Sequence, residues 1–274
     1  MKKAKLLILG TLAACLVMVA ATPAGAIEYD MTTDPTGSPS VTINGAIWEI
    51  LQVADPTGSG VFSAFFRVKA NGTEQGYNTD GRPLQFDELK SKTFTHSFRL
   101  EDVPIIDIGG IPYREFQLDI NENTGGTSYY MSLNEFQVWT TNDPNILGYD
   151  DTTNSFPIGS GDGEAQLAYN FNGGDDSIKM DYRINPGSGK RDYRVYVPVS
   201  YFIELEYVVI FTRHGDTWPT DDGFEEWGVA VYPTAPNTMV QIATSAPADV
   251  VIAGETVDLT VTETNAGTAP LTNV

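Results

Sequence analysis

The chain has 274 residues, of which 36 are Asp or Glu and 16 are Lys or Arg, giving a net charge of −20 at pH 7. A surface this negative repels nucleic acid and anionic membranes, which excludes nucleic acid as a partner, and it attracts divalent cations. The sequence holds one cysteine. An intrachain disulfide is therefore excluded, and core area or metal ions must stabilise the fold.

The first 26 residues have the pattern of a signal peptide. Three lysines within residues 1–5 precede the apolar run Leu6 to Ala21, and Ala24-Gly25-Ala26 matches a small-x-small cleavage site. Lipidation is an alternative, because Leu12-Ala13-Ala14-Cys15 resembles a lipobox. No later apolar run reaches the roughly 18 residues that a membrane-spanning helix needs, so no transmembrane segment is predicted. The sequence thus predicts an exported protein, extracellular or on the cell surface.

Two stretches near the start predict strands. Val41 to Leu51 is interrupted at Asn44-Gly45, a turn pair, which favours a strand or a bent pair of strands. Val61 to Lys69 follows a cluster of turn residues and places its apolar side chains on one face.

The next stretch, Ala70 to Glu88, is polar and predicts a long loop, which in a compact domain is usually functional or an ordered lid. After it, Thr93 to Leu100 alternates between polar and larger side chains. This period predicts a strand, with His96 on the face that points to the core.

Ile111 to Thr141 predicts the central hairpin of the fold. Its two strands flank a polar loop that ends in Gly125-Gly126. The alternation slips by one residue between Leu133 and Phe136, which predicts a bulge or turn at Asn134-Glu135. The residues expected to face the core are Phe116, Leu118, Ile120, Phe136 and Val138, and those expected on the solvent face are Glu115, Gln117 and Asp119.

Further strands follow the hairpin. Tyr207 to Phe211 is apolar on both faces, which is typical of a central strand covered on both sides. Glu226 to Tyr232 alternates large and small residues. The other expected strands are Gln166 to Phe171, Ser177 to Ile184, Tyr193 to Val199 and Ile203 to Thr212. About ten strands with frequent turns predict an all-β fold, an antiparallel two-sheet jelly-roll-like sandwich over residues 27–234.

Residues 235–247 break the strand pattern and predict a linker. In residues 248–274, alternation returns at Val257, Leu259 and Val261. The segment AGETVDLTVTETNAGTAPLTNV resembles the opening half of the immunoglobulin-like, cell-adhesion-related repeat of prokaryotic surface proteins. The resemblance implies that the first strands of a second, immunoglobulin-like domain are present and that the sequence stops before the repeat is complete.

One loop has the ligand spacing of a cation site. Asp119, Asn121 and Asn123 place side-chain oxygens at alternate positions, as calcium-binding loops do. The glycine stands at the seventh position and Tyr130 at the twelfth, so the loop departs from the EF-hand pattern. The alternative is a hairpin loop in which Asn and Gly adopt positive φ. A structural calcium ion is the one cofactor that the sequence indicates.

Residues 117–122 fall one residue short of ExDxxE, the strand motif of laminarinase-like glycoside hydrolases, which are also jelly rolls. Gln117 stands where the nucleophilic carboxylate would be, and an amide cannot take that role. The alternative is a row of polar residues on a solvent-exposed strand. The sequence therefore predicts a protein that is not an enzyme and has no catalytic residues.

Tryptophan rings can stack on sugar rings because they are large and flat. Trp218, beside Pro219 in a loop, and Trp139, at the end of the hairpin, are the candidate ligand-binding residues. The alternative for Trp218 is a plug at the end of the sandwich. Trp48 and Trp227 lie within strand patterns and are expected in the core.

A second resemblance covers residues 58–230. The stretches GSGVFSAFFRVKANGTEQGYNTDGR, FDELKSKTFTHSFRLEDVPIIDIGGIPYREFQLDINE, SLNEFQVW and DGFEEWGV resemble exported sandwich domains of bacterial envelope proteins with PEP-CTERM-type sorting tails. This chain departs from that group by continuing into a surface repeat. The resemblance implies an exported surface or matrix protein and supplies no catalytic residues.

Together these observations predict an exported, non-enzymatic cell-surface or extracellular-matrix module with a structural or adhesive role. One alternative is a carbohydrate-binding module with a structural calcium ion. A second is a degenerate laminarinase-like glycoside hydrolase. The expected partners are polysaccharide or other components of the surface or matrix.

Overall fold

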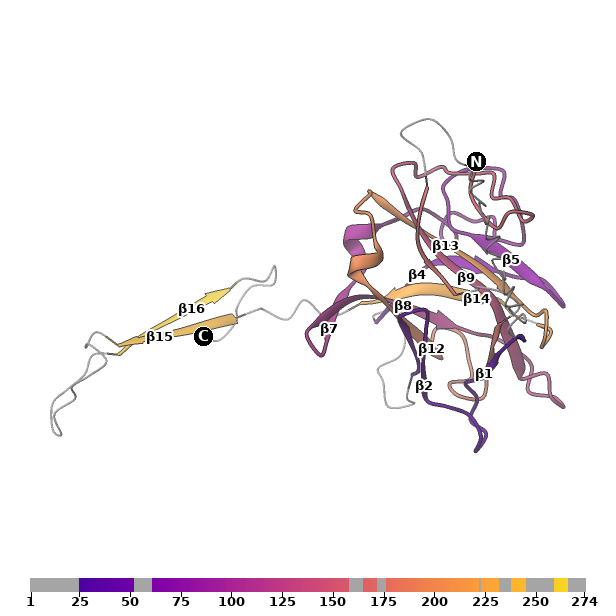
Figure 1. Ribbon diagram of the computed structural model, residues 1–274, viewed down its shortest axis with the longest axis horizontal. Coiled ribbons are helices and arrows are strands. Elements are labelled where there is room, and N and C mark those ends of the chain that lie inside the picture. Colours follow the sequence, from indigo (N-terminus) through magenta and orange to yellow (C-terminus); the bar gives the residue numbers. More distant parts are fainter. Residues whose placement is uncertain are drawn as a thin grey trace, which may run out of the picture.

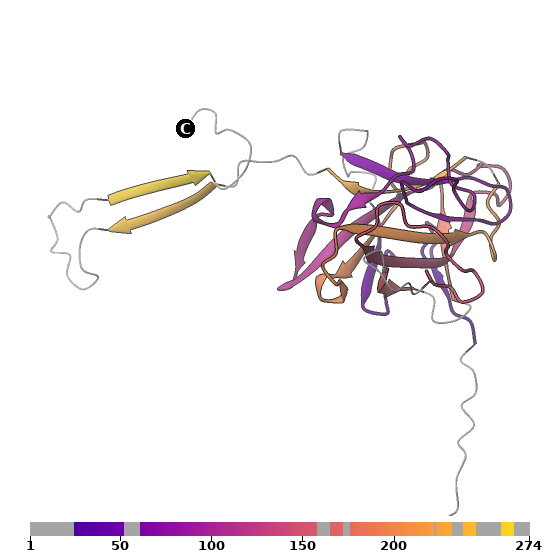
Figure 2. The ribbon, with the colours of Figure 1, turned by 90° about the horizontal axis from the view of Figure 1, so that it is seen from above.

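Two β-sheets stack face to face in the computed structural model (Figures 1 and 2). The model describes residues 25–51, 61–157, 165–171, 176–221 and 223–231, together with the backbone of 238–244 and 259–265. The fold is an all-β sandwich, as the strand pattern predicts. The predicted signal segment falls outside the described residues except for residues 25 and 26, and so does Cys15.

The first sheet has the strand order β1-β11-β9-β13-β5, with β10 added beside β9 and β6 beside β13. Its pairings are antiparallel except for that of β1 with β11, which is parallel. The strands are β1 (Glu28–Asp30), β5 (Glu74–Tyr77), β6 (Phe98–Arg99), β9 (Tyr130–Thr141), β10 (Gln166–Asn170), β11 (Ser177–Asp181) and β13 (Tyr207–His214).

The second sheet has the order β2-β3-β12-β8-β14-β4, with β7 paired to β8. All of its pairings are antiparallel. The strands are β2 (Ser40–Ile43), β3 (Ala46–Ile50), β4 (Phe62–Val68), β7 (Ile105–Ile108), β8 (Ile111–Asp119), β12 (Tyr193–Pro198) and β14 (Glu225–Ala230). Two single 3₁₀ turns, η1 (Leu100–Asp102) and η2 (Val199–Tyr201), complete the elements of the sandwich.

Large aromatic rings fill the space between the sheets. The ring of Phe136 lies 5.1 Å from that of Trp48 and 4.5 Å from that of Trp227, measured between centroids. All three side chains are fully buried, which confirms that Trp48 and Trp227 belong to the core. The inward positions predicted in the hairpin, Phe116, Leu118, Ile120, Phe136 and Val138, are also fully buried. Period-2 alternation thus identified the core face correctly.

The central pair β9 and β13 is covered on both faces. Val208 and Ile210 face the main core, whereas Val209 and Phe211 join a second cluster on the other side of the sheet. In that cluster the rings of Tyr149 and Phe211 stack with centroids 3.8 Å apart. This arrangement confirms the prediction of a doubly covered central strand at Tyr207 to Phe211.

The predicted slip in β9 is a β-bulge. Arg213 pairs with Glu135 and His214 pairs with Leu133, so Asn134 is the extra residue in the ladder. Its side chain is buried and forms local hydrogen bonds, one of them from the backbone N–H of Asp216 at 3.0 Å. The bulge therefore rephases the strand and also holds the loop after β13.

Three expectations about loops and faces were wrong. The stretch Ala70 to Glu88 contains strand β5, which pairs with β13. Within Thr93 to Leu100 only Phe98–Arg99 is a strand, because the N–H groups of residues 94 and 95 both bond to the carbonyl of Ser91 in a turn. The buried residues there are Thr95 and Leu100, while His96 is half-buried.

The third error concerns the outward face of β8. Glu115, Gln117 and Asp119 were expected in solvent, yet all three are buried. Their polar atoms are bound by neighbouring protein groups, including a hydrogen bond of 2.9 Å from Arg191 Nη1 to Gln117 Oε1. On β8 the polar residues that alternate with the apolar ones therefore lie on a face that other protein groups cover.

Beyond residue 231 the described backbone is one antiparallel pair, β15 (Thr238–Thr244) with β16 (Leu259–Asn265). Strand β16 lies in the range predicted to begin the second domain. Strand β15 lies inside residues 235–247, which the sequence predicts to be a linker. The immunoglobulin-like assignment stays a prediction. Within the described residues, no helix has the length and apolar character needed to cross a membrane.

Candidate functional site

A small polar hollow lies at one end of the sandwich, between the loop after β8 and the loop before β14. Its volume is about 200 Å³, and it is lined by Asn121, Glu122, Asn123, Tyr182 and Gly223. Two of these residues, Asn121 and Asn123, were singled out from the sequence as cation ligands. The hollow presents amide, carboxyl and phenol groups, all of which form hydrogen bonds.

Hydrogen bonds between the two loops fix the shape of this hollow. Asn121 Nδ2 donates to the carbonyl of Phe224 at 3.0 Å, and the N–H of Asn123 donates to Asp221 Oδ1 at 3.1 Å. Gly223 has a φ of +90°, and a Cβ there would lie 2.3 Å from the carbonyl oxygen of Asn121. Only glycine therefore allows the two backbones to approach this closely.

Asp119 lies beside the hollow but does not line it. Its carboxylate accepts hydrogen bonds from the backbone N–H groups of Gly189, Lys190 and Arg191, at 2.7, 2.7 and 2.6 Å. Asn121 Nδ2 donates to the same carboxylate at 3.3 Å. Burial raises the pKa of Asp119, although these donors oppose the shift. Its visible role is to anchor the turn before β12.

The three predicted cation ligands thus do not point to one common site. Asp119 binds backbone N–H groups, whereas Asn121 and Asn123 border the hollow. Within the described chain, no group of three or more His, Cys, Asp or Glu side chains has an arrangement that could hold a metal ion. A calcium ion at this loop stays a prediction from the sequence.

An aromatic ladder, formed by Trp218, Lys179, Tyr130, Arg183 and Tyr129, lies next to the hollow. The ammonium group of Lys179 lies 4.2 Å from the ring centroid of Trp218 and 4.0 Å from that of Tyr130. The guanidinium of Arg183 lies 3.7 Å from the ring centroid of Tyr129. Such cation–π contacts hold the rings in fixed positions.

A backbone hydrogen bond links the ladder to the hollow, and within the ladder Tyr130 is only 7 % exposed. The backbone N–H of Tyr182, a residue that lines the hollow, donates to the carbonyl of Tyr129 at 2.9 Å. Trp218 is half-buried, and its indole N–H donates to Glu28 Oε2 at 2.8 Å. The candidate Trp218 therefore stands on the same end of the sandwich as Asn121 and Asn123.

Trp139 is placed elsewhere. Its side chain is only 6 % exposed and packs in the second cluster, with its ring 5.4 Å from that of Phe156. Its indole N–H donates to Gln137 Oε1 at 2.8 Å. Trp139 thus offers no open face to a sugar ring, which corrects the expectation that it is a stacking platform.

The stretch that resembles a hydrolase motif does not surround the hollow as a catalytic set. Gln117 is buried and hydrogen-bonded to Glu115 and Arg191. Glu122 lines the hollow, and its Oε2 accepts a hydrogen bond of 2.9 Å from the backbone N–H of Asp221. Retaining glycosidases hold their two carboxyl groups about 5–5.5 Å apart so that the sugar fits between them. Gln117, an amide, cannot be the nucleophile of such a pair.

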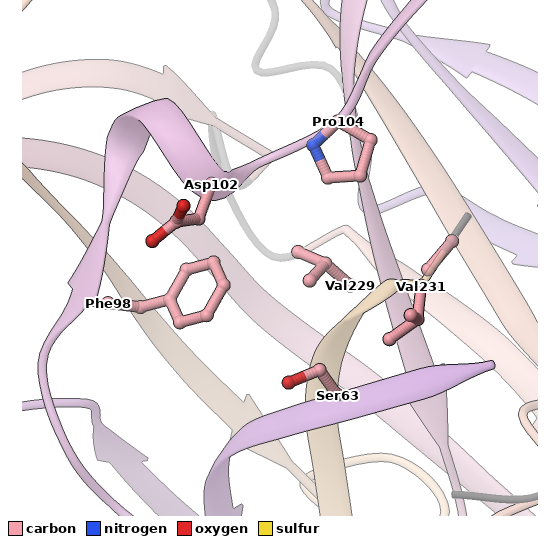
Figure 3. Close-up of a pocket in the computed structure, with 7 residues that line it drawn as sticks. Ser63, Phe98, Asp102, Pro104, Val229 and Val231 are labelled. Carbon is pink, nitrogen blue, oxygen red and sulfur yellow. The ribbon is translucent and has the colours of Figure 1, made fainter. Parts of the chain in front are cut away.

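A second hollow, of about 470 Å³, lies beside strands β4 and β14 (Figure 3). Its lining is mainly apolar, with Phe98, Pro104 and Val229 around it and Asp102 and Ser63 as the polar members. It offers fewer hydrogen-bonding groups to a ligand than the hollow at Asn121.

Comparisons of the chain with protein-family models, with curated proteins and with solved structures give no match. The assignment of a role therefore depends on the geometry alone.

Several residues of the site carry no signal in the sequence. Tyr182 and Gly223 reach the hollow because β11 pairs with β9 and β14 pairs with β8. Lys179 and Arg183 join the ladder through the same pairing of β11. These are contacts between residues far apart in the chain, which local patterns do not reveal. The asparagines were found because their spacing is local.

Proposed function

We propose that this chain is an exported, non-enzymatic adhesion module that binds a polysaccharide of neutral sugars at the cell surface or in the matrix. The observation that carries the proposal is the adjacency of the hollow at Asn121 and Asn123 to the aromatic ladder that contains Trp218. Amides and hydroxyls suit the hydroxyl groups of sugars, and aromatic rings suit their apolar faces.

Size and charge favour this ligand class over others. Hollows that take drug-sized ligands are roughly 300–1,000 Å³, so a volume of about 200 Å³ suits a single sugar unit of a chain that continues over the ladder. The net charge of −20 disfavours polyanionic ligands. Gln117, an amide at the place where the motif has its nucleophile, favours binding over hydrolysis.

Binding to an array of neutral polysaccharides, followed by titration calorimetry on each hit, tests the proposal. Trp218→Ala and Asn123→Ala are each expected to weaken binding at least about tenfold, the equivalent of 1.4 kcal/mol. Tyr201→Ala is the matched control, because Tyr201 is an exposed aromatic residue whose hydroxyl bonds to Asn44 in the turn between β2 and β3.

Two results would overturn the proposal. Equal binding by the wild type and both site variants would show that the ligand binds elsewhere. An array on which no polysaccharide binds would exclude neutral polysaccharides as the ligand. Release of reducing sugar ends from a bound polysaccharide would show that the protein is a hydrolase after all.

A further inference from the structure

The hydrogen bonds of the sandwich begin directly after the predicted cleavage site. Gly25 and Ala26 are exposed, and their backbones form no hydrogen bond with another described residue. Ile27 is the first residue that does: its N–H donates to Asp176 Oδ1 at 2.8 Å, and its carbonyl accepts the N–H of Ser177 at 2.9 Å. The residue where these contacts begin is therefore the one that cleavage after Ala26 would place at the N-terminus.

Asp176 carries a charge that the uncleaved chain does not compensate. It is half-buried, and among the described residues it forms no ion pair with a lysine or arginine. Hydrolysis of the bond between Ala26 and Ile27 adds water across it. The carbonyl of Ala26 becomes a carboxylate, and the nitrogen of Ile27 becomes an ammonium group at neutral pH. A carboxylate binds a charged donor more strongly than an amide N–H.

Strand β1 leads from this contact to the aromatic ladder. It pairs in parallel with β11 at one end of the strand order of the first sheet. Its first residue, Glu28, accepts the indole N–H of Trp218 at 2.8 Å through Oε2. Directly after β1, the N–H of Met31 donates to the carbonyl of Lys179 at 3.0 Å, and the ammonium group of Lys179 lies over the Trp218 ring. The position of β1 therefore bears on both members of the ladder.

We propose that cleavage after Ala26 completes the ligand site, because the new α-ammonium group of Ile27 forms an ion pair with Asp176 and fixes β1 against β11. The first residues of a chain are poorly ordered unless they are held, and β1 has only three residues. The ion pair holds the strand at its start, so Glu28 stays in place to bind the indole of Trp218. The inference rests on the proposed function, because it describes how the binding site at Trp218 is regulated.

The alternative cleavage site, before Cys15, leads to a different N-terminus. Lipidation of Cys15 would leave residues 16–26 attached to Ile27, whose nitrogen would remain an amide. That nitrogen could keep its hydrogen bond to Asp176, but it would bring no charge to the carboxylate. The start of the hydrogen bonds at Ile27 favours cleavage after Ala26.

Amide hydrogen exchange tests the inference without any ligand. Two forms of the chain from Ile27 to Val274 are compared, one with a free α-amino group and one in which the same nitrogen is acetylated. Opening of β1 frees the N–H of Met31 from the carbonyl of Lys179, so exchange at Met31 reports on the strand. Exposed ion pairs shift an equilibrium by at most about fivefold, so acetylation should speed this exchange about two- to fivefold.

Asp176→Asn separates the charge of the carboxylate from its hydrogen bond. Asparagine keeps an oxygen that can accept from the nitrogen of Ile27, but it carries no charge to pair with an ammonium group. The substitution should speed exchange at Met31 about two- to fivefold in the free form and leave the acetylated form nearly unchanged. Asp107→Asn is the control, since this exposed carboxylate also accepts one backbone N–H, that of Gly110. It should change neither form.

Acrylamide quenching of tryptophan fluorescence reports on the ligand site itself. Trp218 is half-buried, whereas the other three tryptophans are at most 6 % exposed, so quenching arises mainly at Trp218. Acetylation of Ile27 is expected to raise the quenching constant, because Glu28 then holds the indole less firmly. Asp176→Asn should have the same effect in the free form.

Four results would overturn the inference. The first is equal exchange at Met31 in the free and acetylated forms, and the second is an effect of Asp176→Asn that is the same size in both. The third is a quenching constant that acetylation leaves unchanged. The fourth comes from N-terminal sequencing of the protein after export, which should begin at Ile27; Cys15 or any other first residue would exclude the ion pair. No readout involves a glycan, so a failure of the proposed function is recognised separately.

Discussion

Replacing Asp119 by alanine would remove the acceptor of three consecutive backbone N–H groups. The carboxylate of Asp119 is fully buried and binds the N–H groups of Gly189, Lys190 and Arg191 at 2.6 to 2.7 Å. No neighbouring acceptor replaces both oxygens once the side chain is truncated. The turn before β12 would then have to open to water or leave its donors unsatisfied.

The expected cost follows from the number of bonds. A hydrogen bond to a charged group contributes about 1.5–3 kcal/mol, and a buried group left without a partner costs about 1–3 kcal/mol. Because the turn can hydrate in part and the bonds share one acceptor, we expect Asp119→Ala to lower the free energy of unfolding by about 3–5 kcal/mol. Asp119→Asn keeps one acceptor oxygen and should cost about half as much.

Urea denaturation followed by tryptophan fluorescence measures these differences. Asp107→Ala is the matched control, since Asp107 accepts one backbone N–H, that of Gly110 at 2.9 Å, at an exposed position. It should cost no more than about 0.5 kcal/mol. A loss below about 1 kcal/mol for Asp119→Ala would refute the reasoning. So would a wild type that loses the same stability in excess chelator, because the carboxylate would then act through a bound cation.

Further changes test other parts of the structure. Phe136→Ala, which leaves a cavity between Trp48 and Trp227, should cost about 3–5 kcal/mol in the same urea assay. Gly223→Ala forces a Cβ against the carbonyl of Asn121, so calorimetry should show weaker glycan binding. Burial lowers the pKa of His214 to about 3, so stability should fall as pH drops from 6.5 towards 3, by at most about 5 kcal/mol; a flat acid titration would contradict this. If calcium is bound at the Asp119 loop, excess chelator should lower the melting midpoint of the protein. An unchanged midpoint would exclude a calcium ion at this loop.

The core could be predicted because a strand has only two faces. Phe116 and Leu118 alternate with polar residues, and the apolar set could face only the core. The same logic failed for Gln117, because alternation tells which residues share a face but not what covers that face. Protein groups, Arg191 among them, meet Gln117 there. Strand β5 was missed because its sequence, EQGY, has no alternation and its place is set by pairing with β13.

The candidate site was predictable in part, for a related reason. Asn121 and Asn123 stand out through local spacing, and Trp218 through its place in a loop. The other residues that line the hollow come from separate elements, since Tyr182 follows β11 and Gly223 precedes β14, so nothing near Asn121 in the chain indicates that it meets them. Trp139 was placed in the ligand site because a tryptophan at the end of a strand resembles an exposed ring. The second cluster that covers it is completed by Ile146, Tyr149 and Phe156, which lie in the segment that follows β9 and folds back over the sheet.

The bulge at Asn134 adds one residue to β9 while the residues on either side of it keep their partners on β13. Deleting Asn134 would join Leu133 directly to Glu135, and their pairs with His214 and Arg213 would form a regular ladder in which Phe136 still faces the core. The sandwich is therefore expected to fold without this residue. What the deletion removes is the side chain that accepts the backbone N–H of Asp216, so the loop after β13, which carries Trp218, would lose one of its anchors to β9.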